Sequence, residues 1–132
     1  MAQNLKILHT GDIHLGSKFS FLGEKATEYR RALVKSFESL ADTAIEKKVD
    51  LVIISGDLFD SPFPSRTTIE IVKRVFKKLV DEGIYTAIIP GNHDYLAPSS
   101  IYTSGELTAN SGKLIVFNDP ANPKFVHPNL KV

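Results

Sequence analysis

Short runs of apolar residues alternate with longer segments in which apolar residues recur every three or four positions. The short runs span residues 5–8, 51–54 and 84–89 and are bounded by Gly, Pro and polar residues. Continuous apolar runs of this length are typical of strands buried in a parallel sheet. The longer segments, 33–45 and 69–80, have the period of amphipathic helices. The chain therefore predicts an α/β fold, a mostly parallel sheet with flanking helices joined by right-handed crossovers.

The pattern also indicates where elements end. Gly83 follows the second helical segment, at the position of a C-terminal cap. Beyond the third predicted strand the periodicity weakens. A short helix that opens at Ser99 or Ser100 and ends near Asn110 is a candidate, and residues 114–117 predict a fourth strand.

Length and composition favour a single compact domain. The chain has 132 residues, 16 Lys and Arg against 15 Asp and Glu, four His and no Cys. The absence of Cys excludes disulfides, thiolate nucleophiles and Cys-based metal sites. A net charge of +1 supplies no large positive field for nucleic acid, although it does not exclude a local basic patch. The N-terminus does not have the pattern of a signal peptide, and the longest aliphatic run, residues 51–54, is too short to cross a bilayer. We therefore expect a soluble intracellular protein with no membrane partner.

Each of the first three predicted strands leads into a glycine followed by a carboxylate or an amide. The three strand ends read Thr10-Gly11-Asp12-Ile13-His14, Ser55-Gly56-Asp57 and Pro90-Gly91-Asn92-His93-Asp94. Ligands of open parallel sheets bind beyond the carboxyl ends of the strands, and glycine allows the backbone to turn sharply there. We therefore expect six side chains to converge on one rim: Asp12, His14, Asp57, Asn92, His93 and Asp94.

The types of these side chains predict a divalent metal. Carboxylate, imidazole and amide ligands without sulfur suit manganese, iron, zinc or magnesium. Asp12 and His14 are two positions apart and would point the same way if the segment were extended, so both could hold one ion. Asp57, central in the order of strands, could bridge two ions about 3.5–4 Å apart, which is an arrangement used for phosphate-ester hydrolysis.

The alternative interpretation of each motif is structural. A single Gly-Asp after a strand is more often a turn or an N-cap than a ligand. Three strand ends that agree, two of them with histidine, favour the metal site. His9, in the first strand, is interpreted as structural. His127, in the proline-rich tail, is interpreted as having no functional role.

These motifs resemble the first three motifs of the calcineurin-like metallophosphoesterases. The segments around them, residues 9–16 and 56–65, further resemble the SbcD-type nuclease subunit of the DNA double-strand-break repair complex. The resemblance extends to about Phe117 and covers about the first third of a typical family member. It implies that residues 1–118 are the N-terminal part of a metallophosphoesterase (nuclease) domain, the first half of an αββα sandwich. Residues 119–132 would be a proline-rich tail, an edge strand or loop, and the domain would be incomplete.

The resemblance also implies roles for the six side chains. Asp12 and His14 would bind the first metal, Asp57 would bridge the two ions, and Asn92 would bind the second. His93 would be the catalytic histidine, oriented by Asp94. Both ions would be manganese, the metal of the nuclease branch. The family completes its site with a Gly-His and a Gly-His-x-His, and no histidine of this chain follows a glycine. We therefore expect the chain alone to be inactive or weakly active.

The implied function is manganese-dependent exonuclease or endonuclease activity on DNA in double-strand-break repair. The implied assembly is a homodimer that works with an SMC-like ATPase subunit in a bacterial or archaeal cytoplasm. Asp60, at a position where bacterial members often carry aspartate, favours a bacterial source. Two alternatives stay open: a phosphoesterase acting on small molecules or phosphoproteins, and a catalytically incomplete dimerisation module.

Two surface features bear on partners. The second helix carries five basic residues that either contact the DNA backbone or, as we favour, form a solvated outer face: Arg66, Lys73, Arg74, Lys77 and Lys78. If the second half of the sandwich is absent, one face of the sheet lacks its cover. Exposed apolar area of this kind predicts a dimer or higher oligomer, with exchange of the proline-rich tail as one route.

Overall fold

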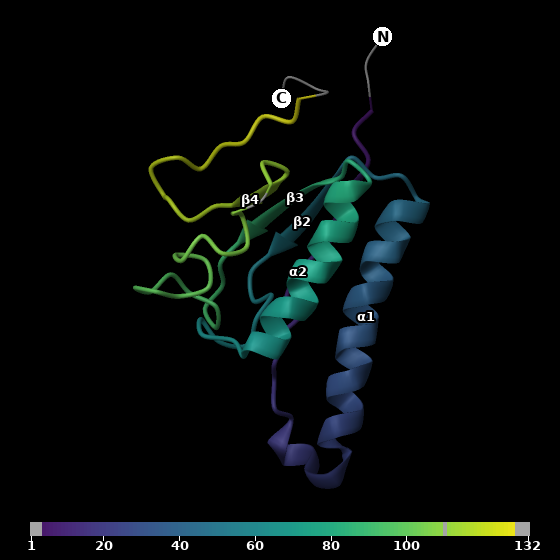
Figure 1. The fold of residues 1–132 in the computed structure, drawn as a ribbon, viewed down its shortest axis with the longest axis vertical. Coiled ribbons are helices and arrows are strands. Elements are labelled where there is room, and N and C mark those ends of the chain that lie inside the picture. Colours follow the sequence, from purple (N-terminus) through teal and green to yellow (C-terminus); the bar gives the residue numbers. More distant parts are fainter. Residues whose placement is uncertain (1–3, 110, 129–132) are drawn as a thin grey trace.

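The computed structural model describes residues 4–109 and 111–128. Its elements follow the order β1 (Ile7–Thr10), η1 (Ser20–Lys25), α1 (Ala26–Glu46), β2 (Leu51–Ser55), α2 (Arg66–Asp81), β3 (Tyr85–Ile89) and β4 (Leu114–Val116). The four strands form one parallel sheet in the order β1-β2-β3-β4 (Figure 1). The predicted α/β fold with a parallel sheet and flanking helices is therefore confirmed.

Both long helices lie on the same face of this sheet. β1, β2 and β3 are neighbours in chain order, so two successive right-handed crossovers place α1 and α2 on one side. Figure 1 shows the two helices side by side in front of the strands. The core forms between them and the sheet, where Phe37 of α1 meets Phe76 of α2 with ring centroids 6.1 Å apart. Val52 and Ile54 of β2 complete this layer, and both are fully buried.

The ends of α2 have clear local causes. The Ser65 hydroxyl accepts a hydrogen bond from the backbone N–H of Thr68, which is a standard N-cap. At the other end Gly83 adopts a φ of 76° and donates its N–H to the carbonyl of Val80. A left-handed glycine is the preferred residue just beyond a helix, so the predicted cap at Gly83 is confirmed. Across residues 4–109 and 111–128, the helices are too short or too polar to span a lipid bilayer.

The opposite face of the sheet carries apolar residues, and no helix within residues 4–109 and 111–128 covers them. Ile7 and Ile89 on this face are 45% and 47% exposed. Among the residues that the structure describes, the C-terminal tail packs over part of it. The Phe125 ring lies 5.6 Å and the His127 ring 4.9 Å from the ring of Tyr85. The structure thus shows an open, apolar sheet face of the kind expected from the sequence.

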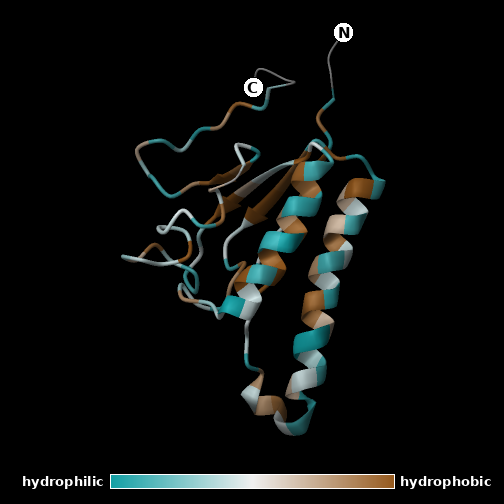
Figure 2. Ribbon diagram, in the orientation of Figure 1, coloured by the Kyte–Doolittle hydropathy of each residue, from teal (hydrophilic) through white to brown (hydrophobic). Residues whose placement is uncertain are grey.

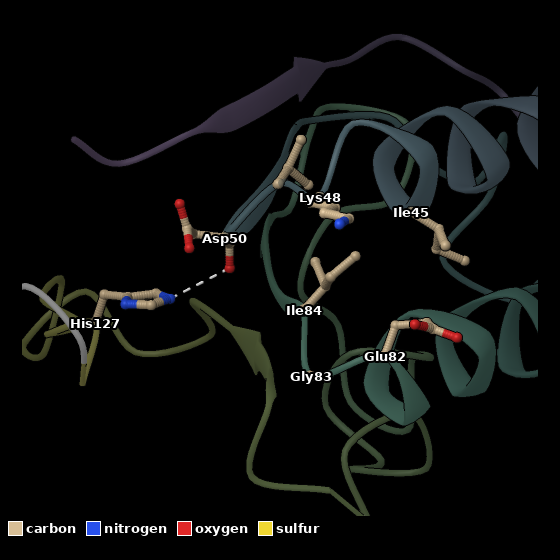
Figure 3. Close-up of a pocket in the computed structure, with 8 residues that line it drawn as sticks. Ile45, Lys48, Asp50, Glu82, Gly83, Ile84 and His127 are labelled. Carbon is tan, nitrogen blue, oxygen red and sulfur yellow. Dashed lines mark hydrogen bonds between the residues drawn. The ribbon is translucent and has the colours of Figure 1, made fainter. Parts of the chain in front are cut away.

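His127, interpreted from the sequence as having no functional role, is buried. Its Nε2 donates a hydrogen bond to the backbone carbonyl of Asp50, 3.2 Å away (Figure 3). The ring borders a pocket of about 350 Å³ at the amino ends of β2 and β3, which is also lined by Ile45 and Ile84. His127 therefore anchors the tail at the end of the sheet opposite to the glycine-containing strand ends.

One expected element is wrong. Residues 99–109 form successive turns instead of the short helix, and Asn110 lies outside the described residues. The Ser100 hydroxyl accepts hydrogen bonds from the backbone N–H groups of Ala97 and Thr103, and Gly105 adopts a φ of 73°. The N–H of Ser104 makes one helical bond to the carbonyl of Ser100, and the left-handed Gly105 then ends the run after a single turn. The tail is a loop over residues 119–128; its last residues, 129–132, are outside the described part.

The buried face of β3 contains one polar atom without a partner. Thr86 is 1% exposed, and within the described ranges its Oγ1 makes no hydrogen bond. A buried hydroxyl without a partner costs about 1–3 kcal/mol relative to a satisfied one. We predict that Thr86→Val, which removes the hydroxyl and keeps the branched shape, raises the free energy of unfolding by about 1 kcal/mol.

Chemical denaturation of both proteins would test this, with Thr67→Val on the exposed start of α2 as the matched control. The control should change stability by less than about 0.5 kcal/mol. A Thr86→Val protein less stable than the parent would show that the hydroxyl has a partner.

Candidate metal centre

The loops after β1 and β2 run side by side beyond the ends of their strands. The backbone N–H of Asp12 donates to the carbonyl of Gly56 at 3.0 Å, and that of His14 donates to the carbonyl of Asp57 at 2.8 Å. An isolated parallel bridge joins Leu15 to Phe59 further along. These bonds continue the sheet pairing into the loops, so the first two motifs are fixed against each other by their backbones.

The backbone at this rim is turned sharply. Asp12, His14 and Asp57 adopt φ values of 53°, 56° and 54°, in the left-handed region. Asp and His tolerate this region better than most residues, but each such position still costs about 1 kcal/mol. The segment is therefore not extended, which was the condition under which Asp12 and His14 would point the same way. Two left-handed residues, and not strand alternation, bring both side chains to the same place.

Asp12, His14 and Asp57 form a compact group of metal-binding atoms. Their carboxylate oxygens and imidazole nitrogen all lie within 4.8 Å of one another. Within this group, His14 Nε2 and Asp57 Oδ2 are 3.6 Å apart. Asp57 is buried, His14 is partly buried and Asp12 is exposed, so the group is open to solvent on the Asp12 side. The structure thus brings together three of the four residues that the sequence predicts as metal ligands.

Asp60 joins this centre as a residue that the predicted site omitted. Its Oδ1 lies 3.0 Å from Nδ1 of His14 and 3.7 Å from Nδ1 of His93. The two imidazoles meet edge to face, with centroids 4.7 Å apart. His14, Asp60 and His93 form a second group whose ligand atoms lie within 4.8 Å of one another. Two such groups therefore share His14.

Asp94 is fully buried and links the loops after β2 and β3. Its Oδ1 accepts the backbone N–H groups of Asp57 at 3.1 Å and Gly91 at 2.7 Å. Its Oδ2 accepts the N–H of Phe59 at 3.2 Å and the hydroxyl of Tyr102 at 2.5 Å. Burial, followed by the hydrogen bond and charge of Asp94, raises the pKa of Tyr102 above its usual value, so this hydroxyl stays protonated and donates.

The last two predicted residues lie on the same loop. His93 is anchored by its backbone, because its N–H donates to Asp57 Oδ1 at 2.8 Å. Its exposed ring lies near Asp60, with Nδ1 3.7 Å from Asp60 Oδ1. Asn92 is part of this loop as well and lies beside His93 in the chain. His9, interpreted as structural, lies on the exposed sheet face, where its Nε2 is 2.8 Å from the hydroxyl of Ser55.

Gly91 allows this loop to approach β2. A Cβ atom at position 91 would overlap the Asp57 carboxylate and would lie 2.5 Å from the Asp57 backbone nitrogen. Both contacts are far below van der Waals distance, and the backbone atom cannot move aside. Glycine is therefore required at position 91 by the space available, because the Asp57 carboxylate already occupies that space.

The five basic residues of α2 lie next to carboxylates. Arg74 and Lys78 pair with Glu38 and Asp42 of α1, and Lys77 pairs with Asp81. Arg66 and Lys73 both approach Glu106. Surface pairs of this kind contribute little to stability, but they neutralise the local charge. The balanced outer surface agrees with the favoured expectation of a solvated face.

Comparisons with known proteins agree with the fold and identify the family. The calcineurin-like phosphoesterase family matches residues 5–129, so this chain belongs to that family. The chain is 35% identical over 109 residues to the DNA double-strand break repair protein Mre11 of Saccharolobus solfataricus, covering 78% of this chain and 28% of that protein. It is 32% identical over 93 residues to the SbcD component of the nuclease SbcCD of Escherichia coli K12, covering 70% of this chain and 22% of that protein.

A solved structure supports the architecture. The nuclease MPE of Pseudomonas putida superposes with a TM-score of 0.57 at 18% identity, over 92% of this chain and 50% of that chain. At this identity the likeness concerns the fold. The chain spans about a quarter of the length of the two curated relatives above. It is therefore a metallophosphoesterase fold unit related to parts of the Mre11 and SbcD proteins.

We predict that Gly91→Ala disrupts the centre because the new methyl group overlaps Asp57. The expected loss is about 2 kcal/mol of unfolding free energy, together with loss of divalent-metal binding. Thermal unfolding and manganese titration calorimetry would measure the two effects. Gly112→Ala is the matched control, since a Cβ there meets nothing within 4 Å. If Gly91→Ala kept the stability and manganese affinity of the control, the close approach of the two loops would be wrong.

Proposed function

We propose that this chain is the metal-binding N-terminal part of a nuclease domain, residues 1–118, that hydrolyses phosphodiester bonds of DNA in double-strand-break repair. The single observation that carries the proposal is the convergence of Asp12, His14, Asp57 and His93 at the carboxyl ends of three parallel strands. The relatives named as a repair protein and a nuclease component support the choice of DNA over other phosphoesters.

The donor set fits divalent metal ions, and two manganese ions are proposed. Carboxylate and imidazole groups are suitable ligands, and the site has no sulfur. Metal-binding histidines commonly donate their second ring N–H to a carboxylate, which fixes the ring. With Nδ1 of His14 donating to Asp60, its Nε2 remains available on the side of Asp57. Asp12, His14 and Asp57 would hold the first ion, with Asp57 bridging to a second ion held by Asn92.

The remaining residues would act on the phosphodiester. Bound divalent ions lower the pKa of a water molecule and neutralise phosphoryl oxygens. His93, whose exposed ring stands 4.7 Å from that of His14, would donate a proton to the leaving oxygen or stabilise developing charge. Asp94 would orient His93 through the loop, since its carboxylate binds the N–H of Gly91 two residues earlier.

The proposed partners are DNA, a second copy of the chain and an SMC-like ATPase subunit, in a bacterial or archaeal cytoplasm. The Escherichia coli relative is itself named as one component of a nuclease. The half-exposed Ile7 and Ile89 on the open sheet face support self-association. The competing functions are phosphoester hydrolysis on small molecules or phosphoproteins, and dimerisation without catalysis.

Manganese binding tests the centre. We predict that Asp57→Asn lowers the affinity for Mn²⁺ by about a hundredfold in titration calorimetry, because the buried residue loses the charge that would face the ions. Asp81→Asn, an exposed carboxylate at the end of α2, is the matched control and should leave the affinity unchanged. Equal manganese binding by both variants would remove the proposed ligand role of Asp57.

Catalysis is tested separately. We predict weak or undetectable cleavage of duplex DNA ends by this chain with Mn²⁺, because the chain lacks the downstream histidine motifs. Any cleavage should disappear in Asp57→Asn and persist in Asp81→Asn. Strong hydrolysis of phosphoprotein or small phosphomonoesters with no action on DNA would favour the competing enzyme.

A further inference from the structure

The second group of metal-binding atoms at the rim differs in composition from the first. The first group, Asp12, His14 and Asp57, has two carboxylates and one imidazole, whereas His14, Asp60 and His93 supply two imidazoles and one carboxylate. Imidazole is a preferred ligand of zinc and of other late transition ions, while manganese favours oxygen ligands. The two groups are therefore suited to different ions.

The distances within the second group match a four-coordinate zinc ion. Asp60 Oδ1 lies 3.0 Å from Nδ1 of His14 and 3.7 Å from Nδ1 of His93. Zinc holds nitrogen and oxygen ligands at about 2.0–2.1 Å, so two ligand atoms at corners of its tetrahedron are about 3.3 Å apart. The two observed distances lie on either side of this value, and small rotations of the side chains bring both to it.

The three ligands are open to solvent. The side chains of His14, Asp60 and His93 are 30%, 35% and 48% exposed. Figure 2 shows hydrophobic colouring along β2 that gives way to pale colouring where the strand ends, so these ligands lie at the polar end of an apolar sheet. An ion can reach them from water, and its fourth position stays free for a water molecule, as in zinc sites with three protein ligands.

The backbone fixes the positions of these ligands. The N–H of His14 donates to the carbonyl of Asp57, and the N–H of Asp60 donates to the carbonyl of Leu15 at 2.9 Å. The N–H of His93 donates to Asp57 Oδ1 at 2.8 Å, and its ring meets that of His14 edge to face. Ligands on segments that are tied together lose little conformational entropy when an ion binds, which favours affinity.

His14 cannot serve both groups at once. A neutral imidazole has one ring nitrogen with a free lone pair, because the other nitrogen carries a proton. If Nε2 of His14 binds manganese beside Asp57, Nδ1 carries the proton and donates it to Asp60. If Nδ1 binds zinc, the proton lies on Nε2, which is 3.6 Å from Asp57 Oδ2. Each carboxylate is a ligand in one state and faces the ring N–H in the other, so the two ions exclude each other.

We propose that His14, Asp60 and His93 form a zinc site that competes with the manganese centre. Asp60 Oδ1 and the Nδ1 atoms of both imidazoles bind the ion, and a water molecule fills the fourth position. The zinc site goes beyond the proposed function, and only its consequence for catalysis rests on that function. Zinc occupies His14 and holds His93 away from the phosphodiester, so it antagonises the manganese-dependent reaction. Because coupled binding is reciprocal, manganese weakens zinc binding by the same factor.

Titration calorimetry of the full chain with Zn²⁺, in buffer without manganese, tests the site. We expect His93→Ala to lower the zinc affinity at least about tenfold, because one of three ligands is lost, and to leave the manganese affinity unchanged. Alanine keeps the backbone N–H that donates to Asp57, so the rim stays in place. His9→Ala is the matched control, because it removes an exposed imidazole that belongs to neither group and should change neither affinity.

Asp12→Asn separates the two groups, because Asp12 belongs to the first group alone and asparagine also tolerates left-handed backbone. It should weaken manganese binding and leave zinc binding unchanged. A zinc affinity that is unaffected by His93→Ala, or that falls as far in Asp12→Asn, would place zinc in the first group and overturn the inference. Zinc and manganese that bind the parent chain together without weakening each other would overturn the competition. Zinc binding is measured without manganese, so failure of the zinc site is distinguishable from failure of the manganese centre.

Discussion

The candidate site depends on one buried carboxylate. Asp94 accepts hydrogen bonds from the backbone of Asp57, Phe59 and Gly91 and from the Tyr102 hydroxyl. Burying a carboxylate in an apolar fold is tolerated only when its oxygens accept enough hydrogen bonds, and these four donors supply them. The interaction ties the loop after β3 to the loop after β2. Without these four donors the cost of burying the charge would not be offset, and Asp57 would lose the neighbours that fix it.

The order of the strands determines which part of the molecular surface carries each feature. Sequential parallel strands put the carboxyl ends at one edge, where the candidate metal-binding side chains meet, and the amino ends at the other, where His127 holds the tail. The same order places both helices on one face, so the opposite, apolar face is covered only in part, by the tail, among the residues that the structure describes. One strand order therefore places three features on different parts of the molecule: the candidate metal centre, the anchor of the tail and the surface available for association.

The sequence predicted the strands, the two long helices and the convergence of the three glycine-containing strand ends, because apolar periodicity and Gly-Asp turns depend on local physics. It did not predict Asp60 at the centre or Tyr102 beneath Asp94, since both contacts join segments distant along the chain. Gly56-Asp57-x-x-Asp60 was the available signal for Asp60. Asp12-x-His14 is not extended as strand alternation would require, because the segment pairs with the loop after β2 and has left-handed backbone there. The expected helix after Ser99 was wrong because the left-handed Gly105 stops the run after a single turn.

The backbone hydrogen bonds to Asp57 and Asp94 have a consequence for the thermodynamics of ligand capture. Because Asp57 Oδ1 already holds the His93 amide, the rim has lost much of its conformational freedom before any cation arrives. A preorganised site loses little conformational entropy when it binds a ligand, so more of the interaction free energy contributes to the affinity. If the rim holds a cation as proposed, most of the entropic cost of ordering the rim has been met during folding, and exchange of one cation for another would leave the loops in place.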